Sequence, residues 1–215
     1  GGIAVIIAIA AASFLGDGGN FGGKFVKKAP RRPAPAAPVS TIKISFSATD
    51  TPARNIAPGS VNQELGTLVF STNNIEDISV KKLGIHLIGT GQSAQLSNLK
   101  IVVPDRNDPN IVALIAGPTA GSNEGFYSFD IANFSIPAGK EVRTKVIGDI
   151  GNQAQPGETF GVSIQQKSSI TVIGNRSRKI ATIEGNFPKN GNLMTIEAAQ
   201  IPPTADISNN DAFIG

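Results

Sequence analysis

Hydrophobic and polar residues alternate along most of the chain after residue 39. Ile42, Ile44 and Phe46, for example, are separated by single polar residues. A period of two is expected of β-strands with one buried face. The runs that we predict as strands are 42–46, 68–70, 78–87, 99–103, 111–115, 126–131, 142–150, 160–164, 170–173, 180–183 and 193–196. Because no amphipathic helix separates these runs, they predict an antiparallel β-sandwich.

Two local signals refine this prediction. The alternation changes phase at Lys81 and Lys82, which predicts a β-bulge within the third run. Asn190 and Gly191 stand between the last two runs, and this dipeptide favours the positive φ angles of a tight type I′ turn. We therefore predict that residues 180–183 and 193–196 form a β-hairpin.

The hydrophobic pattern before residue 39 is different. Residues 3–15 read IAVIIAIAAASFL, with Ser13 as the one polar residue. As a helix this run would span about 20 Å, whereas a bilayer core of about 30 Å requires about 20 residues. The run must therefore be hidden in a membrane, in its own domain or in neighbouring subunits. Since the sequence begins at Gly1 and not at Met, we expect a processed chain or a fragment.

Helix and strand both remain open for this run. Its five alanines and the following Gly16 favour a helix that ends at Leu15. The alternative is a donated strand, because large residues alternate with mostly smaller ones from residue 3 to residue 10. In either form, the residues expected to mediate assembly are Ile3, Val5, Ile6, Ile7, Ile9, Phe14 and Leu15.

Composition divides the chain into four parts. Residues 1–15 form the hydrophobic assembly or anchor segment, and residues 16–38 form a linker that is Gly-rich, then basic and rich in Pro and Ala. Residues 39–200 form the β-sandwich domain, and residues 201–215 form a C-terminal tail. At about 160 residues the sandwich is long enough to bury a core of its own.

The positive charge belongs to the linker. Five basic residues lie between Lys24 and Arg32, and the formal net charge of the whole chain is +3. After residue 40, the 14 basic residues (19 − 5) are balanced by 15 acidic residues (16 − 1, the one being Asp17). We therefore expect no nucleic-acid partner for the folded domain. Two interpretations of the basic residues remain open: they contact anionic lipid headgroups or acidic patches on other subunits, or they simply keep a solvated linker soluble.

The sequence offers little catalytic or cofactor chemistry. It contains no Cys, which excludes disulfides and thiolate metal sites. The single histidine, His86, lies within a predicted strand and is expected to be structural. The glycines of residues 16–23 lack the spacing and flanking elements of a nucleotide-binding loop. We predict a protein that is not an enzyme and holds no cofactor.

Two weaker candidate sites remain. The loop after residue 104 carries four oxygen-bearing side chains suited to calcium, with an Asx-rich turn as the simpler interpretation. These calcium candidates are Asp105, Asn107, Asp108 and Asn110. Asn133 and Asn175 each stand in an N-glycosylation pattern, at a frequency close to that expected by chance.

Residues 134–164 read FSIPAGKEVRTKVIGDIGNQAQPGETFGVSI. A Phe-x-Ile-Pro-Ala-Gly turn, a valine-rich strand, Asp149-Ile150 and a Gly-Glu-Thr turn follow one another here. This series resembles immunoglobulin-like β-sandwich modules of secreted prokaryotic surface proteins. The resemblance implies surface display and a structural role, and it implies no catalytic residue.

The order of apolar segment, linker and β-sandwich is similar to that of archaellins and pilin-type filament subunits, whose N-terminal segments pack in the filament core. The sequence departs from them in a shorter apolar segment and in Val5, where bacterial type IV pilins carry glutamate.

We therefore predict a subunit of an extracellular, pilus-like filament. Its apolar segment is buried in the filament core or in a neighbouring subunit, and its sandwich is displayed at the cell surface. Its partners are other copies of itself, with host or cell surfaces as further partners and a membrane before assembly. The alternative is a membrane-anchored monomeric adhesin or glycan-binding module.

Overall fold

The computed structural model describes residues 38–104, 112–119 and 124–198. The chain divides into two units, and every described residue belongs to the second, residues 37–215. Residues 3–15, nearly all of the linker and the tail lie outside the described ranges, so their predicted conformations stay predictions. Within those ranges the helical segments are two 3-10 turns, η1 (Ser93–Gln95) and η2 (Lys167–Ser169).

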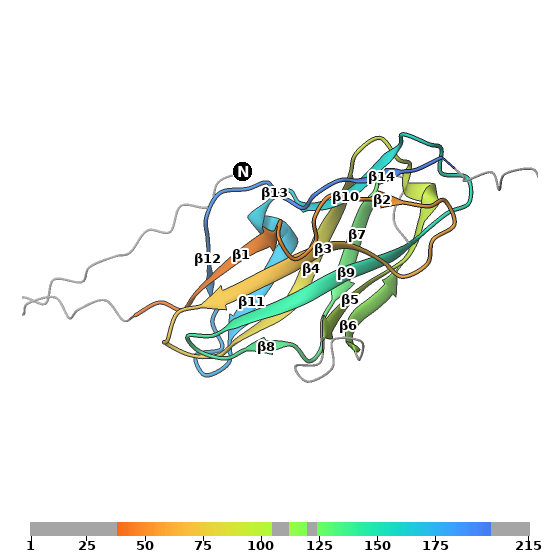
Figure 1. The fold of residues 1–215 in the computed structure, drawn as a ribbon. Coiled ribbons are helices and arrows are strands. Elements are labelled where there is room, and N and C mark those ends of the chain that lie inside the picture. Colours follow the sequence, from red (N-terminus) through yellow and green to blue (C-terminus); the bar gives the residue numbers. More distant parts are fainter. Residues whose placement is uncertain (1–37, 105–111, 120–123, 199–215) are drawn as a thin grey trace, which may run out of the picture. The chain divides into compact units, whose positions relative to one another are not determined.

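One sheet of the described domain has six strands in the order β12-β1-β3-β9-β5-β6 (Figure 1). Its members are β1 (Thr41–Ser47), β3 (Gln63–Thr72), β5 (Leu96–Pro104), β6 (Val112–Thr119), β9 (Glu141–Ile150) and β12 (Thr182–Glu184). Neighbours pair antiparallel except β12, which runs parallel to β1. Its two edges are therefore β12 and β6.

The second sheet has eight strands in the described ranges, and β4 lies at its centre. Its members are β2 (Asn55–Ile56), β4 (Ile78–Ile88), β7 (Phe126–Asp130), β8 (Ser135–Ile136), β10 (Thr159–Ile164), β11 (Ile170–Gly174), β13 (Lys189–Asn190) and β14 (Met194–Ile196). Strands β7 and β8 pair with one edge of β4, and β10 and β11 pair with the other. Strand β14 pairs antiparallel with β10 and parallel with β2.

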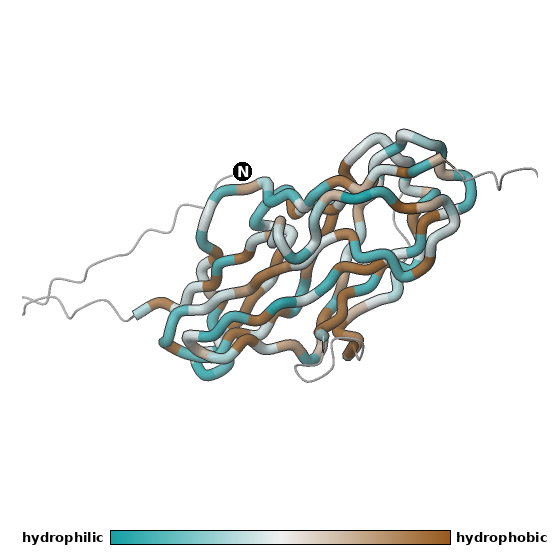
Figure 2. Tube along the Cα trace, viewed as in Figure 1, coloured by the Kyte–Doolittle hydropathy of each residue, from teal (hydrophilic) through white to brown (hydrophobic). Residues whose placement is uncertain are grey.

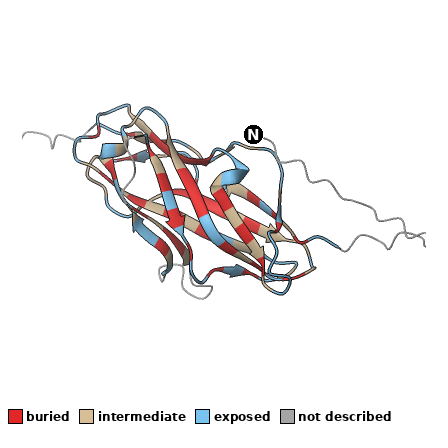
Figure 3. Ribbon diagram, turned by 180° about the vertical axis from the view of Figure 1, so that it is seen from behind, coloured by how far each residue is buried: buried red, intermediate tan, exposed pale blue. Residues whose placement is uncertain are grey.

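The core lies between the two sheets because alternate residues of each strand face inward. Apolar and polar residues therefore alternate in colour along the strands (Figure 2), as do buried and exposed residues (Figure 3). The largest fully buried side chains include Tyr127, Phe70 and Phe160. Phe70 meets Phe134 edge to face, with ring centroids 5.5 Å apart. This core confirms the predicted β-sandwich.

Each predicted run contributes to a strand. The bulge predicted at the lysine pair is also present, because the register between β4 and β11 shifts where Thr171 pairs with Lys82 and Val172 with Val80. Lys81 is the extra residue on β4, and it is exposed. The prediction of antiparallel pairing throughout needs correction, since the β1–β12 and β2–β14 pairs are parallel.

The hairpin predicted at Asn190 and Gly191 is wrong. Asn190 belongs to β13, which pairs antiparallel with β10, and the Gly191 N–H donates to the Val162 carbonyl at 2.8 Å. The two runs that flank this dipeptide pair with different sheets. Backbone pairing with β10 thus replaces the local preference for a turn.

The turn predicted within 134–139 is present. The Lys140 N–H donates to the Pro137 carbonyl at 3.1 Å, and Gly139 has a φ of +66°. The carboxylate of Asp77 accepts a 2.8 Å hydrogen bond from the Ala138 N–H and so ties this turn to the segment before β4. The turn separates β8 in one sheet from β9 in the other.

Candidate functional site

Strand β6 is an edge strand that carries exposed apolar side chains. Its pairing within the described ranges is with β5, in a register that sets Leu114 against Val102 and Val112 against Pro104. The side chains of Leu114 and Val112 are 57% and 42% exposed. Figure 3 shows β6 at the margin of the sandwich, largely in the colour of exposed residues. None of the eight residues of β6 is charged.

A groove of about 450 Å³ runs along the outer face of β5 and β6. Its apolar lining consists of Val102, Val112, Leu114 and Pro118. Val102 is only 1% exposed, yet it does not belong to the core cluster between the sheets. Leu114 pairs with Val102 across the strands and so lies on the same face, which gives the sheet a small apolar surface on the side opposite its core.

A polar rim borders this groove. Lys100 Nζ donates to Asn62 Oδ1 at 2.6 Å, while the Asn62 N–H and Asn98 Nδ2 each donate to the Asp149 carboxylate at 2.6 Å. The hydrogen bond from the Asn62 backbone lowers the pKa of Asp149 most, followed by that from Asn98 and by the charge of Lys100. The rim groups thus satisfy one another, as is typical of the border of a protein–protein contact.

A second polar cluster crosses β3 and β9 in the same sheet. Lys145 Nζ lies 2.9 Å from Glu64 Oε2, and Thr67 Oγ1 donates to Glu64 Oε1 at 2.8 Å. Thr51 also donates to Glu64. Burial raises the pKa of Glu64, but the hydrogen bonds from Thr51, Lys145 and Thr67 outweigh it, so the net shift is downward. The cluster therefore links β3 to β9, and the Glu64 carboxylate is engaged by Thr51, Thr67 and Lys145.

A third cluster fixes the start of the domain. Glu76 is 7% exposed and accepts hydrogen bonds from the Ser40 hydroxyl and from the backbone N–H groups of Arg176 and Ser177, the last two at 2.7 and 2.8 Å. These bonds, with Ser40 the strongest, lower the pKa of Glu76 to about 2. Ser40 is adjacent to the end of the linker, so Glu76 anchors the point where the linker meets the sandwich.

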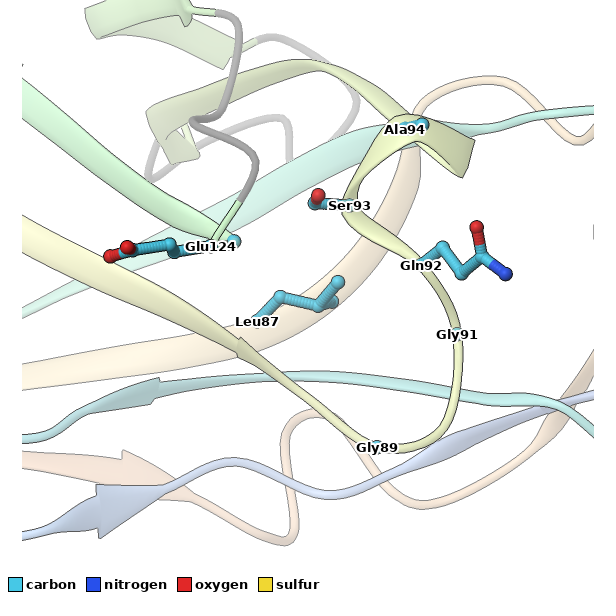
Figure 4. A pocket seen from close by; sticks show the side chains of 8 residues that line it. Leu87, Gly89, Gly91, Gln92, Ser93, Ala94 and Glu124 are labelled. Atoms are coloured by element: carbon cyan, nitrogen blue, oxygen red, sulfur yellow. The ribbon is translucent and has the colours of Figure 1, made fainter.

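A separate hollow lies beside the connection from β4 to η1 (Figure 4). In that view the Ser93 side chain points toward the side where Glu124 lies, whereas Gln92 points away. Of the described residues that line the hollow, Glu124 is the one ionisable group. No histidine and no second carboxylate is among these described lining residues, so they supply no acid–base pair.

The sites predicted from the sequence fall in different places. The assembly residues in 3–15 and the calcium candidates Asp105, Asn107, Asp108 and Asn110 lie outside the described residues. Asn133 is exposed between β7 and β8. The Asn175 amide, by contrast, accepts from Ser79 at 2.6 Å and donates to Ser135 at 2.9 Å.

His86 lies in β4 against Phe126, with ring centroids 4.7 Å apart. The described residues contain no group of three His, Asp or Glu side chains that could hold a metal ion. Nor do they contain a helix with the length and hydrophobicity needed to cross a membrane.

The groove along β6 was not predicted from the sequence. The apolar run at 111–115 predicts a strand, but it does not show whether that strand lies inside a sheet or at its edge. The available signal was the stretch from 111 to 119, which has no charged residue and includes apolar β-formers such as Val112 and Ile115.

No family model matches the chain, and no curated protein matches it. The fold is similar to the seventh ScaB type I cohesin of Pseudobacteroides cellulosolvens, with 18% identity, a TM-score of 0.39, and coverage of 77% of this chain and 96% of the cohesin. A cohesin in the Coh-OlpA-Doc918 complex of Clostridium thermocellum shows 12% identity, a TM-score of 0.41, and coverage of 73% and 99%.

The fold is also similar to the CssB subunit of the enterotoxigenic Escherichia coli colonization factor CS6, which was solved with a donor strand from the CssA subunit. Identity is 15%, the TM-score is 0.31, and coverage is 73% of this chain and 97% of CssB. Likenesses at this level concern the arrangement of strands, so no binding partner is transferred from them to this chain.

Proposed function

We propose that this chain is a non-enzymatic structural subunit of an extracellular, pilus-like polymer. The apolar segment 3–15 of each copy is buried in other copies, and the β-sandwich is displayed on the outside. The observation that carries the proposal is that segment: thirteen residues of which only Ser13 is polar, on the same chain as a sandwich with a buried core of its own. Exposed to water, such a run would drive association.

The linker supports the same function. Residues 16–38 separate the apolar segment from β1, and a chain of this length spans at most about 80 Å when extended. A segment on such a tether reaches a neighbouring copy without distortion of its own sandwich. Contacts between an arm and a different surface are heterologous, and heterologous contacts that do not close form open polymers.

The chemistry of the described domain is consistent with a structural role. Its carboxylates with lowered pKa values, Glu64, Glu76 and Asp149, are held by hydrogen bonds that join strands and loops. A catalytic base requires an accessible group placed next to a nucleophile or substrate. Glu64, Glu76 and Asp149 instead stabilise the fold through these hydrogen bonds.

Replacement of Ile7 with Asp tests the proposal. An isolated carboxylate is costly to bury, so Ile7→Asp is expected to abolish polymers while the sandwich stays folded. Asn20→Asp adds the same charge within the Gly-rich linker and is the matched control. The measurements are negative-stain electron microscopy, sedimentation velocity and far-UV circular dichroism on all three proteins.

Three results are informative. Filaments from the unmodified chain and from Asn20→Asp, with folded monomers from Ile7→Asp, support the polymer. Filaments of normal length and number from Ile7→Asp contradict the burial of segment 3–15. Particles from the unmodified chain that disperse only in detergent favour a membrane-anchored surface module, and a glycan screen follows from that result.

A further inference from the structure

We propose that the outer edge of β6 accepts residues 3–15 of a second copy as an added β-strand. The inference rests on the proposed function as a polymer subunit and specifies where one copy receives the arm of the next. In this arrangement the apolar segment extends the six-stranded sheet beyond Val112–Thr119. Its backbone would pair with β6, and its side chains would fill the groove lined by Val102 and Leu114.

The first reason is that the two edges of the six-stranded sheet differ. Strand β12 is three residues long and ends in Glu184, which are features that protect an edge from pairing with other chains. Strand β6 has eight residues and no charge, and its Pro118 lies toward one end. The stretch from Val112 to Ala116 therefore carries neither a charge nor a proline, so it is the edge suited to receive another strand.

The second reason is the apolar surface next to that edge. Of the described large hydrophobic side chains that are exposed, Val112 and Leu114 lie on β6 itself, beside the buried Val102. A strand added to β6 places every second side chain on this face. Ile3, Val5, Ile7 and Ile9 have that spacing. The occupant and the groove thus match in polarity and in period.

The third reason concerns which copy supplies the strand. Between β1, where the linker enters, and β6 lie β3, β9 and β5, so β1 and β6 are about 19 Å apart at 4.8 Å per strand. The linker is long enough to bridge this distance within one chain. Insertion of its own arm would occupy the β6 edge and end growth, whereas donation to a second copy leaves one free edge and one free arm on every polymer. The prolines between Pro30 and Pro38 stiffen the end of the linker nearest the sandwich, which favours donation outward.

The edge is tested first by charge. Leu114→Lys places an ammonium group in the groove, and we expect it to raise the critical concentration for polymerisation by about tenfold or more. Ile180→Lys is the matched control, because Ile180 is 79% exposed and lies beside β12, away from β6. The control is expected to change the critical concentration less than about twofold. Circular dichroism on both variants verifies that the sandwich is folded.

The pairing itself is tested by cross-linking. The chain contains no native cysteine, so every disulfide forms between introduced residues. Copies with Leu114→Cys are mixed with copies that carry a single cysteine at position 5, 6, 7 or 8, and the mixtures are oxidised and run on a non-reducing gel. We expect heterodimers from positions 5 and 7 and not from positions 6 and 8, because 5 and 7 face the groove with position 114 and residues of paired strands have Cβ atoms about 5 Å apart on one face only.

The outcomes distinguish a failure of the β6 acceptor site from a failure of the proposed polymer. Filaments that tolerate Leu114→Lys and give no cross-link to position 114 overturn the β6 site and leave the polymer intact. Cross-links without alternation between odd and even positions overturn the strand. A chain carrying both Ile7→Cys and Leu114→Cys that oxidises as a faster-migrating monomer, with no filaments from the unmodified chain, overturns both proposals. A loss of filaments in Leu114→Lys together with alternating cross-links between copies supports both.

Discussion

At the scale of single residues, Glu76 links the start of the sandwich to the turn after β11. Its carboxylate accepts hydrogen bonds from Ser40 and from the backbone of Arg176 and Ser177. These bonds lower its pKa from 4.5 to about 2. A lowered carboxyl pKa stabilises the folded state above the unfolded value, and that contribution is lost as the pH falls from about 4.5 to about 2.

We therefore expect Glu76→Gln to lower the free energy of unfolding at pH 7. The difference from the unmodified chain should shrink as the pH falls below about 4.5. Glu76 is protonated first in the unfolded chain, near pH 4.5, and only near pH 2 in the folded chain. Urea titrations at pH 7, 4 and 2.5 measure the difference. The control is Glu184→Gln on β12, whose carboxylate is exposed and whose loss should cost less than about 0.5 kcal/mol. A difference between Glu76→Gln and the unmodified chain that stays constant with pH would contradict the role of the ionised carboxylate.

At the scale of elements, the end of β4 packs directly on the start of β10. Gly89 has a φ of +110°, and a Cβ built there would lie 2.2 Å from the Thr159 carbonyl oxygen. The Gly91 N–H donates to the same carbonyl at 3.0 Å. The two strands approach so closely that position 89 has no room for a side chain.

Gly89→Ala should therefore destabilise the domain by more than the cost of a positive φ alone. Gly157→Ala is the matched control, because Gly157 has a φ of +87° and no atom within 4 Å of a Cβ built there. We expect about 1–2 kcal/mol for the control from its φ and at least about 1 kcal/mol more for Gly89→Ala from the overlap with the backbone. Thermal and urea unfolding provide the comparison, and equal losses for the two variants would contradict the packing argument.

The same scale explains how much of the fold follows from the sequence. Alternation predicts strands such as β1 and β9 because each has one face in the core and one outside. Asn190-Gly191 gives a false hairpin because its local preference is weaker than the hydrogen bonds to β10. The two-residue strands β2, β8 and β13 are too short to show any period.

The candidate site is predicted less well than the fold. The strand at β6 follows from its residues, but its position at the edge depends on the order of strands, which brings β5 and β9 together from distant parts of the chain. Strand order arises from long-range packing and is not encoded in local periodicity. The rim of Asn62, Asn98 and Asp149 is likewise assembled from segments that are separated by 36 and 51 residues.

At the scale of the whole molecule, the arm and the β6 edge define opposite ends of the proposed polymer. A chain shortened to begin at Val39 keeps the core described above and the acceptor edge, but it has no segment 3–15 to donate. By itself it is expected to be a folded monomer. Mixed with full-length chains it should bind the free arm of each growing polymer and stop further addition at that end, because it offers no arm of its own.

Filament length should therefore fall as the fraction of shortened chain rises, and equimolar mixing should leave oligomers of only a few subunits. The shortened chain with Leu114→Lys is the control, since its altered edge should neither bind arms nor shorten filaments. Electron microscopy gives the length distribution, and sedimentation velocity gives the oligomer sizes. If both shortened chains reduce filament length equally, then the shortened chain does not bind the free arm at its β6 edge. If neither does so, then growth does not depend on arm donation at a free sheet edge.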